Sequence, residues 1–337
     1  MQSKGELMSI PSIDEVAAAA GVHKSTVSRA FSRPEAVKKQ TREHVLAVAA
    51  SMGYSMSPLA QALRTKTSTL VPLIVPDITN PFFAELAKAM TAAAGERGYQ
   101  LILCVTGDDA GATAGYLQAM QSMYAPFAVI APFTRVDPAD FEAYGFGSKL
   151  VVIDRIESEH QVPTVTVDSG TGIRLAFDHL VGLGHDSIAY VSGIVGTHTA
   201  TDRREAYLEL AAEHGMDPIE FGDGIGAEAG ERAAIAIEAM PTRPTAVIAA
   251  NDLVAFGLIS ALGERGIRVP EHISVVGFDG LPLGARSNPP LTSVQQPITE
   301  MGRIAIELAE QAVATDDIQH VVLEPTLLVR SSTGPAR

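Results

Sequence analysis

The chain has 337 residues, 46% of them hydrophobic, and a formal net charge of −14. This length exceeds what one ordinary hydrophobic core covers, so we expect two or three domains. The single cysteine, Cys104, excludes an internal disulfide, and no apolar run approaches the length of a membrane span. With no apolar leader at the start, we expect a cytoplasmic protein in which Cys104 is a buried, inert thiol.

The charge is unevenly distributed along the chain. Residues 1–66 contain 9 Lys and Arg against 5 Asp and Glu, a balance of +4, which leaves 16 against 34, or −18, for the remainder. A basic segment on an acidic body confines attraction for nucleic acid to one end of the molecule, because the body repels phosphate.

Residues 12–31 have the pattern of two short helices across a tight turn. Ser12 and Glu15 have the spacing of a capping box. Apolar residues follow at helical spacing: Ile13, Val16, Ala17 and Ala20. Gly21 can end this helix at positive φ without a steric penalty. A second stripe of Val27, Ala30 and Phe31 predicts the second helix.

The outer face of the second helix carries only cations and short hydroxyls: Lys24, Ser25, Thr26, Ser28 and Arg29. Such groups neutralise phosphates and reach base edges in the major groove. The pattern therefore predicts a recognition helix that binds double-stranded DNA. The alternative is a solvated helix with ordinary surface charge.

Three segments resemble a known family: Glu15-Val16-Ala17, Ala20-Gly21-Val22 and Thr26-Val27-Ser28-Arg29-Ala30. They are similar to the DNA-binding head of the LacI/GalR (lactose-repressor type) family, which reads "DVA..AGVS..TVSR". The resemblance implies a transcriptional regulator, in most cases a repressor, that binds a palindromic operator as a homodimer.

A third helix is predicted from Val45, Val48, Ala49 and Met52, stopped by Gly53. The position of Lys38 is usually a hydroxyl N-cap in the family, and lysine cannot accept from the open N–H groups. We expect this substitution to destabilise the head by about 1 kcal/mol unless a neighbour caps the helix.

The segment that follows resembles the family's hinge, "GY.PN..A..L". Gly53-Tyr54 and the run 57–64 carry the similarity, which places Tyr54 among the DNA contacts. Ser57 can cap this run and Pro58 suits its first position, but two turns are too short to be stable alone. The resemblance gives Leu63 the role of an apolar wedge in the minor groove. The alternative is a plain linker with one exposed leucine.

From Leu70 onward, short β-rich runs alternate with helical stretches. The strand candidates are Leu70–Val75, Gln100–Val105, Ala128–Ala131, Leu150–Ile153, Val165–Val167, Ile188–Val191, Ala246–Ala249, Ile273–Val276 and, at the end, Val321–Val329. The helix candidates are Phe82–Arg97, Gly170–Leu183, Asp202–His214, Glu228–Met240, Leu253–Arg265 and a last one from Met301. This alternation predicts two doubly wound α/β subdomains with parallel sheets and helices on both faces.

Polar residues cluster just after the predicted strands. They are Asp77 and Asn80, Asp154 and Arg155, Asn251 and Asp252, and Asp279, with Arg203 near a helix start. In open α/β sheets ligands bind beyond the C-terminal strand ends, so we expect a cleft for a small polar molecule between the lobes.

Further motifs in the body resemble the same family. They are the runs 77–83, 152–155 and 275–279, Asn251-Asp252, and the Pro290-Leu291-Thr292-Ser293-Val294 segment. The resemblance implies a periplasmic-binding-protein-like body whose chain crosses between lobes near residues 160, 290 and 320. By the same match, the effector contacts are Phe82, Phe83, Asp154, Arg203, Asn251 and Asp279.

A purely structural role is the alternative for such residues. Asn251 and Asp252 could cap a helix, Asp154 could end a strand, Phe82 and Phe83 could be core, and His185 could be structural. Two positions also depart from the family pattern, since Gly280 stands where a second Asp is common and Ala206 where Gly is common.

The leading hypothesis has three segments: a helix-turn-helix domain (1–56), a hinge helix and linker (57–68), and an effector-binding and dimerisation domain (69–337). An enzyme is the second hypothesis, but the sequence has no G-x-G-x-x-G after a strand, no P-loop, no G-x-S-x-G elbow and no His/Cys metal spacing. A solute-binding protein is the third hypothesis, and the basic head argues against it.

No cofactor or metal is expected. The acids, amides and aromatic rings favour a sugar as effector, with a nucleobase or nucleoside as the alternative.

Overall fold

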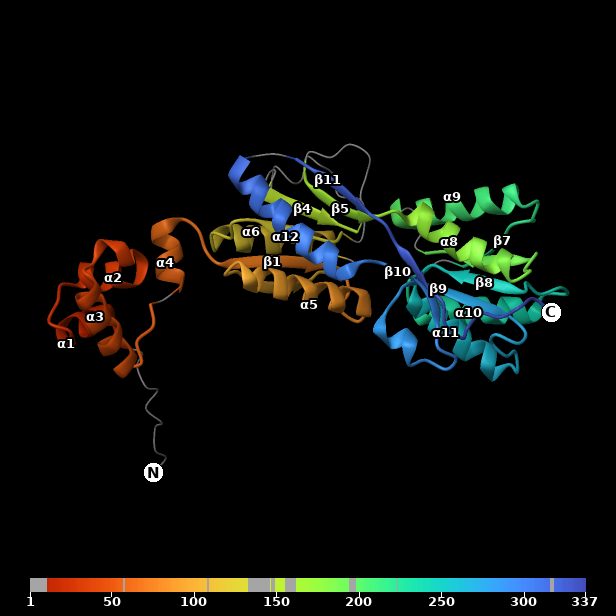
Figure 1. The fold of residues 1–337 in the computed structure, drawn as a ribbon, viewed down its shortest axis with the longest axis horizontal. Coiled ribbons are helices and arrows are strands. Elements are labelled where there is room, and N and C mark those ends of the chain that lie inside the picture. Colours follow the sequence, from red (N-terminus) through yellow and green to blue (C-terminus); the bar gives the residue numbers. More distant parts are fainter. Residues whose placement is uncertain are drawn as a thin grey trace, which may run out of the picture. The chain divides into compact units, whose positions relative to one another are not determined.

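The computed structural model describes residues 11–56, 58–107, 109–132, 146, 149–154, 162–193, 198–222, 224–315 and 318–337. The chain divides into two compact units, Met1–Ser68 and Thr69–Arg337, here called the head and the body (Figure 1). No helix in the described part of the chain is both long and apolar enough to cross a membrane.

The head is built on three helices that contact one another: α1 (Ile13–Ala19), α2 (Lys24–Ser32) and α3 (Lys39–Ser51), with the 3-10 helix η1 (Pro34–Ala36) between the last two. Their buried faces meet at Val16, Val27 and Val45. The predicted capping box is confirmed. The N–H of Glu15 donates to Ser12 Oγ at 3.3 Å and the N–H of Ser12 donates to Glu15 Oε2 at 2.6 Å.

α3 begins without a side-chain cap. Lys38 occupies the N-cap position and makes no capping hydrogen bond, as the sequence predicts. We expect Lys38→Asp to stabilise the head by about 1 kcal/mol, because a carboxylate accepts from the open N–H groups and favours the positive end of the helix. Thermal unfolding of the full chain checks this. Lys38→Ala separates the two effects, since it removes the charge without adding a cap, and an equal gain in both variants would contradict the capping argument.

The head ends in a short helix, α4 (Pro58–Thr65), with proline in its first position. Ala62 is buried, whereas the next residue, Leu63, is 59% exposed. Ser57, predicted to cap this helix, lies outside the described residues. Eight residues give about two turns, too few for a helix to be stable on its own in water.

The body contains two six-stranded sheets, one in each lobe. Lobe 1 holds the sheet ordered β11-β5-β4-β3-β1-β2, and lobe 2 holds the sheet ordered β12-β10-β9-β8-β6-β7. The strands of lobe 1 are β1 (Leu70–Val75), β2 (Gln100–Val105), β3 (Ala128–Ile130), β4 (Leu150–Ile153), β5 (Thr164–Val167) and β11 (His320–Leu323). Those of lobe 2 are β6 (Ile188–Val191), β7 (Ile219–Phe221), β8 (Ala246–Ala249), β9 (Ser274–Asp279), β10 (Thr292–Gln295) and β12 (Thr326–Leu328). Neighbouring strands are parallel except β10 and β12, which are antiparallel.

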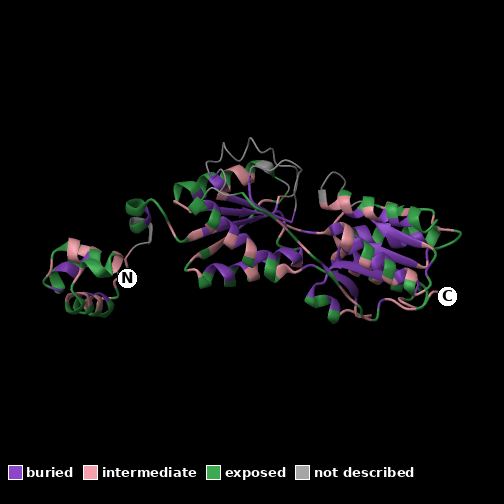
Figure 2. Ribbon diagram, turned by 45° about the horizontal axis from the view of Figure 1, so that its top comes forward, coloured by how far each residue is buried: buried purple, intermediate pink, exposed green. Residues whose placement is uncertain are grey.

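Helices cover both faces of each sheet, and buried strand residues alternate between them (Figure 2). In lobe 1, α5 (Pro81–Glu96) and α12 (Ile298–Thr315) cover one face, and α6 (Ala110–Ser122) covers the other. In lobe 2, α10 (Ala227–Ala239) and α11 (Asp252–Glu264) lie opposite α8 (Ser169–Gly182) and α9 (His198–Glu213). On β6, for example, Ala189 and Val191 pack with α10 and α11, whereas Ile188 and Tyr190 pack with α8 and α9. This is the doubly wound arrangement that the alternation predicts.

The chain crosses between the lobes three times. It passes from β5 to α8 at residue 168, from β10 to α12 at residues 296–297, and from β11 to β12 at residues 324–325. Each lobe is therefore assembled from separate stretches of sequence.

Among the described α-helices and strands of the body, three are absent from the predicted set: α6, β7 and β10. Gly111 and Gly115 weaken the helical pattern of α6, yet Leu117 is fully buried and anchors it against lobe 1. β7 has three residues at a sheet edge, too short for alternation to be seen. Helix α9 also begins earlier than predicted, at His198, so Arg203 lies in its second turn.

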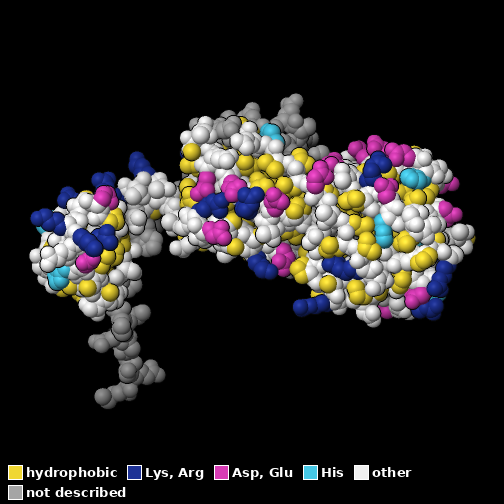
Figure 3. All heavy atoms as spheres, viewed as in Figure 1, with side chains coloured by type: hydrophobic (Ala, Val, Ile, Leu, Met, Phe, Trp, Pro, Cys, Tyr) yellow, Lys and Arg dark blue, Asp and Glu magenta, His cyan; other side chains and the backbone are white. Residues whose placement is uncertain are grey.

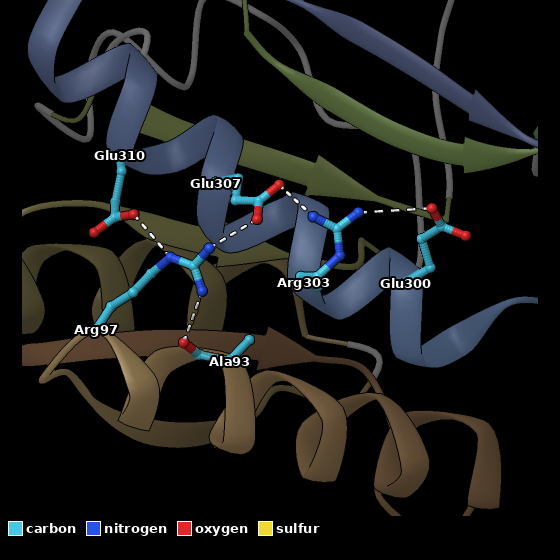
Figure 4. A network of polar contacts seen from close by, with 6 residues as sticks. All are labelled: Ala93, Arg97, Glu300, Arg303, Glu307 and Glu310. Carbon is cyan, nitrogen blue, oxygen red and sulfur yellow. Dashed lines mark hydrogen bonds and ion pairs between the residues drawn. The ribbon is translucent and has the colours of Figure 1, made fainter.

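A network of ion pairs joins α5 to α12 (Figure 4). Arg97 donates from Nη2 to Glu307 Oε1 at 2.7 Å and from Nε to Glu310 Oε2 at 3.0 Å. Arg303 donates to the other oxygen of Glu307 at 2.6 Å. Single exposed pairs contribute little, but here each charge is shared within one network. The network fixes α12 against α5 in lobe 1.

Candidate functional site

The outer face of α2 brings together the five residues predicted from the sequence. Val27 and Ala30 turn into the head core, whereas Lys24 and Arg29 are exposed and Ser25, Thr26 and Ser28 are partly exposed. Figure 3 shows Lys and Arg side chains on the surface of the head. The face offers cations and hydroxyls with no carboxylate among them, as contact with DNA phosphates and base edges requires.

His23 caps α2, which the sequence did not predict. Its Nδ1 accepts from the N–H of Ser25 at 3.2 Å and lies 2.9 Å from Ser25 Oγ. An imidazole can accept there only when Nδ1 is unprotonated. This position carries Ser in the family pattern, and here a ring nitrogen takes the place of the hydroxyl oxygen as the capping acceptor.

Other predicted DNA contacts have partners within the head. Lys24 Nζ lies 3.5 Å from Asp14 Oδ1, both side chains being exposed, so the pair is weak and easily exchanged for a phosphate. The Tyr54 ring packs edge-on against Phe31, with centroids 5.7 Å apart. Leu63 of α4 remains largely exposed. The structure thus groups Tyr54 with the core of the head and leaves Leu63 on its surface.

A second site lies in the body, where both lobes line one pocket. The space amounts to about 480 Å³, part of it open to solvent. Its lining residues are Asn80, Phe82, Phe83, Asp154, Gly193, Thr199, Ala200, Arg203, Ile225, Ala250, Asn251, Asp279 and Gln296. All six residues predicted as effector contacts are among them. Asp77 is not, and instead accepts from the N–H of Thr79 at 2.8 Å.

Lobe 1 contributes two phenylalanines and two polar residues to the pocket. Asn80 caps α5 by accepting from the N–H of Phe82 at 3.0 Å. Phe82 and Phe83 pack edge-on, with centroids 5.2 Å apart, and both belong to the core of lobe 1. Asp154 follows β4 at a φ of +71°. The two phenylalanines therefore have the core-packing role given above as the alternative, and they also line the pocket.

Arg203 is held in lobe 2 by three contacts. Its guanidinium carbon lies 3.6 Å from the centroid of the Phe278 ring. Nη1 donates to the carbonyl of Ala250 at 2.8 Å, and Nε donates to Ser169 Oγ at 3.3 Å. Stacking and two hydrogen bonds fix the planar group before any ligand arrives, which reduces the entropy lost on binding.

Asp279 is the last residue of β9 and is 5% exposed. Its Oδ1 accepts from Gln296 Nε2 at 2.8 Å. Burial, and next the nearby carboxylate of Asp252, raise the pKa of Asp279 well above its ordinary value. A ligand that donates hydrogen bonds here would compensate a carboxylate that has lost its water.

Asn251 and Asp252 have different roles although they are adjacent. Asn251 lines the pocket and caps α11 by accepting from the N–H of Val254 at 2.8 Å. Asp252 does not line it; this carboxylate is fully buried, and burial raises its pKa to about 7. The sequence could not separate the two, because both stand at the same helix start.

Gln296 is a pocket residue that the sequence missed. It is 3% exposed, and its Oε1 has no hydrogen-bond partner among the residues that the structure describes. Gln296 stands at the second crossing, directly after β10 and before Pro297, where neither a strand nor a helix pattern marks it. A buried acceptor without a donor is unfavourable, and a hydroxyl or an N–H is the kind of group that satisfies it.

His185 has the structural role that its position suggested. Its ring lies 2.9 Å from Thr245 Oγ1 through Nδ1, and 3.0 Å from both Ser274 Oγ and the carbonyl of Gly334 through Nε2. Burial lowers the pKa of His185. Within the described residues, no cluster of three or more His, Cys, Asp or Glu could hold a metal ion.

Comparison with known proteins agrees with this division. Residues 12–57 match the lacI family of bacterial regulatory proteins, and residues 177–333 match the periplasmic binding protein-like domain. The ribose operon repressor of Halalkalibacterium halodurans is 33% identical over 325 residues, covering 95% of this chain and 96% of that protein. The chain belongs to the lacI family.

Solved structures of lacI-family proteins extend the likeness to the fold. The Lac repressor bound to ONPG superimposes with a TM-score of 0.84 at 25% identity, covering 96% of this chain and 100% of the other. A regulator from Enterococcus faecium with bound ribose gives 0.71 at 26% identity, covering 80% and 100%. The lacI-family relatives are transcriptional regulators rather than enzymes, and this chain is likewise a transcriptional regulator with an N-terminal DNA-binding domain and an effector-binding body.

Proposed function

We propose that the protein is a repressor that binds a palindromic operator as a homodimer and is controlled by a sugar in the pocket between its lobes. Functionally, residues 1–56 recognise DNA, residues 57–68 form the hinge and linker, and residues 69–337 bind effector and dimerise. The observation that carries the proposal is the pocket itself, because both lobes supply its polar side chains while a separate basic unit supplies the DNA-binding face.

The chemistry of the pocket supports a polyhydroxylated ligand. Asp154 and Asp279 accept from hydroxyls, Arg203 donates, and Asn251 and Gln296 can do both. Phe82 and Phe83 supply the apolar part of the lining, which a sugar ring can contact. One relative is named a ribose operon repressor, and a second was solved with bound ribose. These two relatives favour D-ribose as the first sugar to measure.

A ligand that touches both lobes provides a mechanism of control. Phe82 and Asp154 stand on lobe 1, and Arg203 and Asp279 on lobe 2, so bound sugar favours the arrangement in which both sets reach it. It shifts DNA binding only by the difference in its affinity for the DNA-competent and incompetent arrangements. The α4 helices of the two subunits would then be held together or separated.

Dimerisation is supported by an exposed apolar edge. β2 is the last strand of its sheet, and on it Leu103 and Val105 are 41% and 37% exposed. An unpaired apolar edge strand is unfavourable in an isolated monomer, and a second copy of lobe 1 would cover it. A dimer also presents two heads, as an inverted repeat requires.

The experiment that tests the proposal is selection from random double-stranded oligonucleotides by the purified full chain, followed by binding measurements with and without D-ribose. We expect enrichment of an inverted repeat and a change in affinity for it when the effector is present. No preference over random competitor, with or without a broad metabolite pool, would overturn the proposal.

We expect Arg29→Ala to weaken operator binding by about 1–3 kcal/mol and to relax the preference at one base position, because an arginine on this face can donate two hydrogen bonds to guanine. Binding to the selected site and to single-base variants measures this. A loss that is equal on all sequences would reduce Arg29 to a phosphate contact.

Leu63→Ala tests the proposed wedge. Inserting an apolar side chain between base pairs stabilises only a site that can be kinked, so we expect the specific complex to weaken more than binding to random DNA. Gln61→Ala, an exposed change in the same helix, is the control. Equal weakening of specific and non-specific binding by Leu63→Ala would remove the wedge role.

A further inference from the structure

The turn after Asp279 is held by two buried side chains that do not line the pocket. Asp252 Oδ2 accepts from the N–H of Leu281 at 2.7 Å, and Ser293 Oγ accepts from the N–H of Gly280 at 3.0 Å. Ser293 also donates to Asp252 Oδ1 at 2.5 Å. Both side chains are fully buried, and together they satisfy the two N–H groups that follow Asp279.

The backbone at this turn would not keep its shape unaided. Asp279 has a φ of +124°, which side-chain-bearing residues rarely adopt and which costs about 1–3 kcal/mol. Gly280 follows at +70°, and a Cβ there would lie 2.6 Å from the Cα of Gln295. The backbone around position 280, where the family often has a second Asp, therefore leaves room only for glycine. The strained turn persists because surrounding groups over-determine it.

The neighbouring sequence makes room for Asp252. A Cβ on Gly277 would lie 2.3 Å from Asp252 Oδ1, so only glycine at this point of β9 lets the carboxylate lie over the strand. Asp252 thus connects the start of α11 to the turn after β9 and to Ser293 of β10. Asn251, its neighbour, lines the pocket from the same helix start.

We infer that Asp252 and Ser293 are positioning residues for effector binding: they hold the turn that aims the Asp279 carboxylate into the pocket. Neither lines the pocket. This inference rests on the proposed function, because it assigns the purpose of the turn to the pocket that Asp279 lines. It predicts that effector affinity depends on two side chains outside the pocket.

Ser293→Ala and Asp252→Ala in the full chain test this. Each leaves at least one N–H of the turn without its partner, and we expect the affinity for D-ribose, measured by calorimetry, to fall at least tenfold. Ser332→Ala is the matched control. Ser332 is an equally buried hydroxyl of lobe 2 that accepts from the N–H of Thr292 at 2.8 Å and donates to the carbonyl of Val275. It therefore bonds the same two strands, β9 and β10, but not the N–H groups of Gly280 and Leu281. The affinity of Ser332→Ala should stay within threefold of the wild type even if its melting temperature falls as far as that of Ser293→Ala.

Asp252→Asn separates hydrogen bonding from charge. The amide oxygen can still accept from Leu281 and the NH₂ group can donate to Ser293, so we expect affinity within threefold of the wild type. Equal losses in Asp252→Asn and Asp252→Ala would overturn the positioning account, as would a loss in Ser332→Ala as large as that in Ser293→Ala.

Crystal structures of the ligand-free variants provide an arm that needs no sugar. In Ser293→Ala we expect Asp279 to leave its positive φ and its carboxylate to turn from the pocket, whereas in Ser332→Ala both should be retained. An unchanged Asp279 in Ser293→Ala would refute the positioning role whatever the ligand is. Failure of the wild type to bind D-ribose would instead count against ribose as the proposed effector and leave this arm intact.

Discussion

Asp279→Ala is expected to remove the effector response while leaving operator binding intact. The substitution deletes the most deeply buried carboxylate of the pocket, and hydrogen bonds to charged groups contribute about 1.5–3 kcal/mol, so effector affinity should fall roughly 10- to 150-fold. Operator binding belongs to the head, a separate compact unit. Calorimetry with the sugar that most raises the melting temperature of the wild type, together with operator binding at increasing sugar, measures both properties.

The same variant should lose less stability than the wild type as pH rises. Because the folded-state pKa of Asp279 is raised, the protonated form is favoured by folding, and wild-type stability is lost as pH rises from the unfolded pKa through the folded one. The variant lacks this group, so its melting temperature should decline less as pH rises above the ordinary pKa of an aspartate, about 4. Asp252 titrates with Asp279 and contributes to the remaining slope of stability against pH.

An effector dose response of Asp279→Ala equal to that of the wild type would move the effector site away from Asp279.

Gly257→Ala should be severely destabilising. Gly257 lies in α11 where this helix crosses α10, and a Cβ there would be 1.9 Å from the carbonyl oxygen of Ala227. Since the obstacle is backbone rather than a flexible side chain, the two helices must separate, which costs about 3 kcal/mol or more. Denaturant unfolding of the full chain measures the loss.

Gly263→Ala is the control for this prediction. Gly263 is exposed in the last turn of the same helix, and a Cβ there would meet no atom within 4 Å. Alanine is the better helix former by up to about 1 kcal/mol, so this variant should be neutral or slightly stabilised. Similar losses in both variants would mean that close packing of α10 and α11 is not what limits position 257.

Much of the fold could be predicted because its signals are local. Leu70–Val75 and Ile188–Val191 are short apolar runs bounded by polar or turn residues, and the structure has these strands at the predicted bounds. The basic face of α2 follows from the spacing of Lys24 and Arg29 against the buried Val27. Such features depend on periodicity alone, and tertiary packing does not alter them.

The remaining features depend on contacts between distant parts of the chain. Gln296 enters the pocket only because β10 ends beside β9, and Asp252 turns inward only because Gly277 leaves space for it. His23 caps α2 through a ring nitrogen, a cap that residue preferences do not favour. The predicted positions of Asp154, Arg203 and Asn251 at one pocket came from the rule that strand ends meet and from family resemblance. The hydrogen bonds and ring contacts that hold these residues in place could not be derived from strand ends or from resemblance.

The three crossings have a consequence for synthesis of the chain on the ribosome. The head consists of contiguous residues and can fold as soon as it emerges. Lobe 1 lacks α12 and its edge strand β11 until residue 323 has been made, and lobe 2 lacks β12 until residue 328. A nascent chain therefore carries a finished DNA-binding unit ahead of two incomplete sheets with exposed apolar faces, the kind of intermediate that aggregates or recruits chaperones. Truncation by even the last few dozen residues would leave both lobes unfinished.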